Sequence, residues 1–86
     1  MINIKNLEVC FYTAIEKSMK YVAVKIQMQG FEKPEIIINQ KENFDTKLAY
    51  YKKAYNKDLT LKAFNGIKII GFTYGDSYNE IETDLV

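Results

Sequence analysis

The stretch ENFDTKLAYYKKAYNK, residues 42–57, carries the clearest helical period in the chain. Its large apolar side chains recur at intervals of four, three and four residues, which places them on one face of a helix: Phe44, Leu48, Tyr51 and Tyr55. A helix with one apolar face has to bury that face against another layer. The stretch therefore predicts a central helix packed across a sheet, with Asn39 or Asn43 as its N-terminal cap.

The opposite surface of this predicted helix is basic and carries an aromatic ring. Lys47, Lys53 and Lys57 lie outside the apolar stripe, and Tyr50 lies at its edge. Lysines beside a tyrosine can contact phosphates while the ring stacks on a base, so these residues are candidate nucleic-acid contacts. A solvated helix face is the simpler interpretation, and a formal net charge of +1 favours it.

Three segments around the helix have the pattern of strands. In residues 21–29 large apolar side chains occupy every second position, Val22, Val24, Ile26 and Met28, which is typical of a strand. Residues 67–74 are rich in β-branched and aromatic residues. Residues 35–39 contain three consecutive isoleucines, which suit a strand buried on both faces. We therefore expect residues 35–39 to lie inside the sheet.

Residues 7–16, LEVCFYTAIE, fit both a strand and a helix. As a strand, the segment faces one side with Leu7, Val9, Phe11 and Ile15. As a helix, its apolar stripe is Leu7, Cys10, Phe11, Ala14, Ile15 and Met19, with Asn6 as a possible cap. The content of β-branched and aromatic residues favours the strand. A strand would place Tyr12 on the sheet face away from the central helix.

Tyr21 would lie on that same sheet face, so Tyr12 and Tyr21 are candidate interaction residues together with Tyr50. Exposed tyrosines give protein interfaces a large contact area at a low cost in entropy. The competing interpretation is that the C-terminal helix covers this face.

The C-terminal third also leaves one alternative open. Asn65 and Gly66 indicate a hairpin turn, with residues 59–64 as its first strand. On that register Ile67 and Ile69 face away from Ile70 and Phe72. Alternatively, the central helix continues through residues 59–64 and stops at Asn65 and Gly66. Further on, residues 77–80 have a capping-box pattern that predicts a short helix ending near residue 85.

Composition restricts the function classes. A chain of 86 residues predicts a single domain, residues 1–86. It has no histidine and no arginine, so the usual general base and the usual bidentate phosphate ligand are both missing. Cys10 is the single cysteine, which excludes an internal disulfide and a thiolate metal cluster. No apolar run is long enough to span a membrane. We expect a cytoplasmic, non-enzymatic protein without cofactor, metal or small-molecule substrate.

Two segments carry a resemblance, PEIIINQKENFDTKLAYYKKAYNKDL and GIKIIGFTYGDSYNEIETDL. They resemble small uncharacterised proteins encoded by phages and prophages of low-GC Gram-positive bacteria. The resemblance spans about residues 21–85, and it implies a cytoplasmic accessory protein that binds host or phage macromolecules. It transfers no activity and no site residues.

Together these observations predict an α+β domain. Its antiparallel sheet has about four strands, with one central helix across a face and a short C-terminal helix. The function we expect is a protein-interaction module that binds a partner or itself as a homodimer. The alternative is a weak, sequence-tolerant nucleic-acid binder, and a small enzyme is the third possibility.

Overall fold

The computed structural model describes residues 2–85, the side chains of residues 83 and 84 excepted. It confirms the predicted α+β class. In chain order the elements are α1 (Ile4–Glu16), β1 (Tyr21–Met28), β2 (Glu35–Gln40), the 3-10 turn η1 (Lys41–Asn43), α2 (Phe44–Ala54), β3 (Thr60–Leu61), β4 (Phe64–Gly75) and α3 (Tyr78–Leu85).

The four strands form one antiparallel sheet in the order β2-β1-β4-β3. β1 is a central strand that pairs with β2 on one side and with β4 on the other. β2 is an edge strand, so the expectation that residues 35–39 lie inside the sheet is wrong. The three isoleucines of β2 are half-buried, because the strand has a neighbour on one side only.

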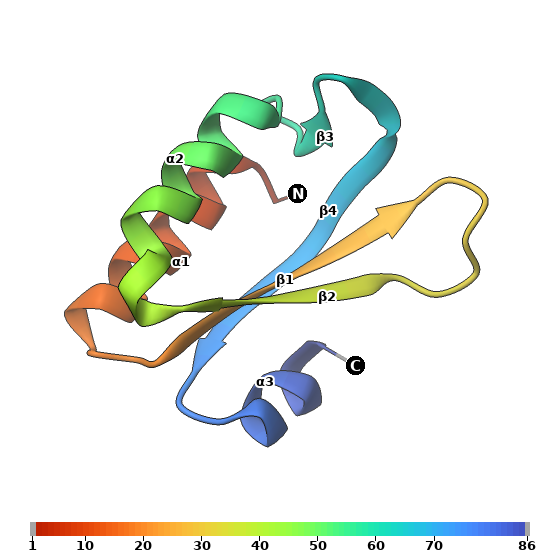
Figure 1. The fold of residues 1–86 in the computed structure, drawn as a ribbon. Helices are drawn as coiled ribbons and strands as arrows, with labels where there is room; N and C mark the ends of the chain where they lie inside the picture. Colours follow the sequence, from red (N-terminus) through yellow and green to blue (C-terminus); the bar gives the residue numbers. More distant parts are fainter. Residues whose placement is uncertain (1, 86) are drawn as a thin grey trace.

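The helices form two layers on opposite faces of the sheet (Figure 1). α1 and α2 lie together on one face, and α3 lies on the other. The face beneath α1 and α2 is the apolar face that alternation predicts for β1, with Val22, Val24 and Ile26 buried. On the opposite face Ala23 is fully buried, and the ring of Tyr21 lies 5.0 Å from that of Tyr78 in α3.

The N-terminal segment is a helix, so the predicted strand over residues 7–16 is wrong. Asn3 caps the helix: its side chain accepts hydrogen bonds from the backbone N–H groups of Lys5 and Asn6, and the Asn6 side chain accepts from the Asn3 N–H. β1 already pairs along both of its edges, which leaves no position beside it for a hairpin partner. Val9, a core residue in the strand interpretation, is 59% exposed.

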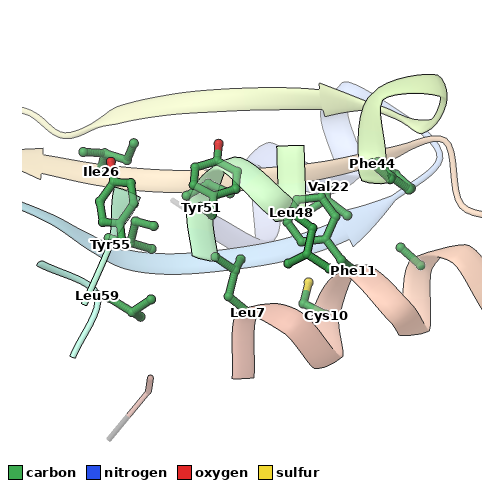
Figure 2. Packing of buried hydrophobic residues seen from close by; sticks show 13 residues of the cluster. Leu7, Cys10, Phe11, Val22, Ile26, Phe44, Leu48, Tyr51, Tyr55 and Leu59 are labelled. Atoms are coloured by element: carbon green, nitrogen blue, oxygen red, sulfur yellow. The ribbon is translucent and has the colours of Figure 1, made fainter. Parts of the chain in front are cut away.

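Side chains of α1, α2 and the sheet form one apolar core (Figure 2). Phe11 is its centre, with its ring edge-on to Phe44 at 5.6 Å and tilted against Tyr51 at 6.1 Å between ring centroids. The stripe predicted for the central helix is confirmed, because Phe44, Leu48, Tyr51 and Tyr55 are all buried. The helix is shorter than the periodic stretch and ends at Ala54.

Neither predicted cap holds the start of α2 with its side chain. Asn43 occupies the capping position but makes no side-chain capping bond, and η1 precedes the helix instead. Asn39 is buried within β2, where its side-chain amide donates to the Val22 carbonyl at 3.1 Å and to the Tyr51 hydroxyl at 3.3 Å. Asn39 therefore joins β2, β1 and α2.

The segment after α2 is a hairpin, so the predicted helix extension through residues 59–64 is wrong. The turn lies at residues 62–63, however, and Asn65 and Gly66 lie within β4. The predicted separation of Ile69 and Phe72 onto opposite faces is also wrong, because a bulge in β4 pairs Lys25 with Gly71 but Ile26 with Ile69. The bulge brings Ile69 and Phe72 to the same face, against the core.

The C-terminal helix is confirmed, with its predicted cap. The Ser77 hydroxyl accepts the Glu80 N–H at 3.3 Å, and Ile81 is fully buried against the sheet. Gly75 lies directly beneath it, since a Cβ at that position would approach the Ile81 side chain to 3.3 Å.

Candidate interaction surfaces

The two tyrosines predicted to share a sheet face lie in different layers. Tyr12 is on α1 and is 53% exposed, whereas Tyr21 is on β1 and packs against Tyr78. The prediction that Tyr12 and Tyr21 share one sheet face is therefore wrong, because it required residues 7–16 to be a strand. The competing interpretation, cover by the C-terminal helix, describes Tyr21 correctly.

Tyr50 lies on the flank of α2 that faces away from α1. It is 49% exposed, and the Lys47 ammonium lies 5.7 Å from the centre of its ring. Together with Asn43 and Thr46 these two residues line an open groove of about 380 Å³. The groove combines an amphipathic ring, a cation and two small polar groups, which suits contact with a polypeptide.

The predicted nucleic-acid contacts do not form one surface. Lys47 and Lys53 are six positions apart on α2, so they project about 120° apart around the helix axis. Lys57 follows the end of the helix, where its carbonyl accepts the Ile4 N–H at 2.9 Å and its side chain lies in a pocket with Lys5. Lys47 therefore lies on a different side of α2 from Lys53.

The remaining reactive groups are placed for packing. Cys10 is buried among core side chains, and this burial raises the pKa of its thiol to about 11, which disfavours the nucleophilic thiolate. Within residues 2–85, side chains of 83 and 84 apart, no three His, Cys, Asp or Glu residues come together as a metal site. Lys52 forms an ion pair with Glu8 between α2 and α1.

The edge of β2 is a surface that the sequence did not indicate. β1 and β2 pair in the register Val22 with Asn39 and Val24 with Ile37, and the Lys41 N–H continues it by donating to the Lys20 carbonyl. Antiparallel pairs alternate between bonded and non-bonded, so the odd-numbered residues of β2 bond to β1. The backbone groups of the even-numbered residues point outward: Ile36, Ile38 and Gln40.

The two edges of the sheet differ in how they are protected. β3 is two residues long, and its pairing with β4 is irregular, which are common ways of blunting an edge. β2 is six residues long and regular, and between Glu35 and Lys41 it carries no charged side chain. An open, regular, isoleucine-rich edge is a template for pairing with another strand.

α2 is the helix closest to this edge. α1 contacts β1 and β4, whereas α2 contacts β2 through the Asn39 and Tyr51 hydrogen bond. Since α1 occupies one flank of α2, the groove beside Tyr50 lies on the flank toward the open edge. We call the outward backbone groups of β2 and this groove together the β2–α2 surface: Ile36, Ile38, Gln40, Asn43, Thr46, Lys47 and Tyr50. Ile36, Ile38 and Gln40 contribute backbone groups only, since their side chains lie on the sheet face away from α2.

Comparisons of the chain with protein-family models, with curated proteins and with solved structures found no match. Among residues 2–85, none of the helices has the length and apolar character needed to cross a membrane.

Proposed function

We propose that this protein is a non-enzymatic interaction module that binds an extended polypeptide segment at the β2–α2 surface. The observation that carries the proposal is the unpaired edge of β2. The N–H and C=O groups of Ile36 and Ile38 and the N–H of Gln40 have no backbone partner among the described residues, whereas the Gln40 carbonyl accepts the first hydrogen bond of η1. An added strand would satisfy all of these groups at once.

The chemistry of the surface supports this mode of binding. Each backbone hydrogen bond of an added strand contributes about 0.5–1.5 kcal/mol net. These bonds give affinity without sequence selectivity, so selectivity has to come from side-chain contacts. The groove beside Tyr50 can receive alternate side chains of the added strand, with the ring as an apolar wall and Lys47 as a cation.

The resemblance to phage and prophage proteins makes a bacterial cytoplasmic protein the first partner to test. The experiment is affinity capture from a lysate of a low-GC Gram-positive bacterium, with the wild type and two variants as baits. Gln40→Pro removes an outward N–H at a position whose φ of −85° suits proline. Tyr12→Lys alters an exposed side chain on α1 and serves as the matched control.

Binding by strand addition predicts proteins that the wild type and Tyr12→Lys retain and Gln40→Pro loses. If Gln40→Pro retains the same proteins as the wild type, the β2 edge is not the binding surface. If Tyr12→Lys alone loses them, the outer face of α1 is the binding surface instead.

The second candidate function is weak nucleic-acid binding. Lys53 and Lys57 are exposed and form no ion pair within the part of the chain described, unlike Lys52, and Lys5 extends the basic region near Lys57. This function predicts retention on DNA that weakens with salt and is lost in the double variant Lys53→Glu, Lys57→Glu. Retention that is indifferent to both changes would exclude it.

A further inference from the structure

We propose that the occupant of the β2 edge is a second copy of this chain. The two β2 strands pair antiparallel about a twofold axis at Ile38. This inference rests on the proposed function, since it names the partner of the same edge. Two observations support it: the β2 edge is complementary to a second copy of itself in its hydrogen-bonding groups and in its charges.

The hydrogen-bonding groups select the register. With Ile38 opposite Ile38 of the second copy, Ile36 lies opposite Gln40 and Gln40 opposite Ile36. Every outward-pointing residue of β2 then faces another outward-pointing residue. The Ile38 pair exchanges two hydrogen bonds, and in each Ile36–Gln40 pair the Gln40 N–H donates to the Ile36 carbonyl, because the Gln40 carbonyl is used by η1. A register centred on Ile37 would place Gln40 opposite Pro34, which has no N–H to donate.

The charges at the two ends of β2 favour the same register. Pairing about Ile38 places Glu35 opposite Lys41 of the second copy, and the twofold axis repeats this pair at the other end of the seam. Neither side chain forms an ion pair in the described part of the single chain. Opposite charges directly across two strands stabilise the pairing, and like charges destabilise it.

The helices also fit this arrangement. An antiparallel pair of identical strands has its twofold axis perpendicular to the sheet, so the α1 and α2 layers of both copies lie on the same side. The flank of α2 with Lys47 and Tyr50 then faces the same flank of the other copy across the seam. Pairing would extend the four-stranded sheet and cover the groove in one step.

The test is the dissociation constant of the dimer, measured by sedimentation velocity over a dilution series. Glu35→Lys and Lys41→Glu each place like charges at both ends of the seam. We expect each to raise the dissociation constant about tenfold, equivalent to about 1.4 kcal/mol. The double variant Glu35→Lys, Lys41→Glu exchanges the two charges and is expected to restore the wild-type value.

Two further variants separate this seam from other contacts. Gln40→Pro is expected to yield a monomer with an unchanged circular dichroism spectrum, and Tyr12→Lys is expected to remain a dimer. If Gln40→Pro still forms a dimer, the two chains do not pair through β2. If the double variant Glu35→Lys, Lys41→Glu does not recover the wild-type dissociation constant, the register about Ile38 is wrong.

A wild type that stays monomeric at the highest concentration reached would overturn self-pairing. That result leaves strand addition by a foreign protein intact, since the capture experiment tests it separately. Hydrogen exchange provides a second measurement. In a dimer the amides of Ile36, Ile38 and Gln40 become protected as concentration rises, and protection that is independent of concentration would contradict the proposal.

Discussion

Replacing Phe11 and Val9 separately by alanine tests the helical assignment of residues 4–16. In a strand both side chains would face the core, but in α1 only Phe11 does, being fully buried while Val9 is 59% exposed. Phe11→Ala removes a core ring and its contacts with Phe44 and Tyr51. Substitutions of this kind cost about 3–5 kcal/mol.

That loss is a large part of the total stability, which for a chain of 86 residues is about 4–13 kcal/mol. Val9→Ala is expected to change stability by less than about 0.5 kcal/mol, because an exposed valine is replaced by a better helix former. The assay is urea unfolding followed by far-UV circular dichroism. The free energies of unfolding of the two variants are compared with the same m-value, the slope of that free energy against urea concentration. Equal destabilisation by the two variants would refute the helix and the core built on it.

Three further predictions concern buried polar and ionisable groups. Tyr51→Phe, which removes the hydroxyl bonded to Asn39, is expected to cost about 1 kcal/mol in urea unfolding, and Tyr50→Phe is expected to cost nothing measurable. Burial raises the pKa of Tyr55 to about 12, so the folded chain holds this proton more tightly than the unfolded chain. The contribution of this group to stability is therefore fully present below about pH 10 and is lost as the pH rises through 12. Alkaline titration of tyrosinate absorbance checks this. Cys10 is expected to react with a thiol reagent only as fast as the chain unfolds, and rapid reaction of the folded protein would contradict its burial.

The central part of the fold could be predicted because its periods are unambiguous. The stripe from Phe44 to Tyr55 fits a helix and no strand, and the alternation from Val22 to Met28 fits a strand and no helix. Both were correct in type, and the class of the fold follows from them.

Residues 7–16 could not be assigned by pattern, because Leu7 and Phe11 are four positions apart and lie on one face in either structure. The decision depended on tertiary structure, since both edges of β1 were taken by β2 and β4. The capping box of Asn3 and Asn6 was the local signal that could have changed the prediction.

The β2–α2 surface depends on strand order, which the sequence does not contain. Three consecutive isoleucines are equally compatible with a central strand and with an edge strand that receives another chain. Tyr50 could be identified as exposed from its place on the helix, but its position near an open edge could not. In the same way, the sequence did not show that Tyr12 and Tyr21 lie on opposite sides of the sheet, because that depends on how the helices and strands are arranged.

The place of α1 in the fold has a consequence for synthesis on the ribosome. α1 is translated before the surfaces that cover Leu7 and Phe11, which belong to β1, α2 and β4, and β4 (Phe64–Gly75) comes last of these. The apolar face of α1 is therefore not fully covered until β4 has been translated. A nascent chain halted before β4 would expose that face to chaperones, and the core is completed only after β4 has emerged.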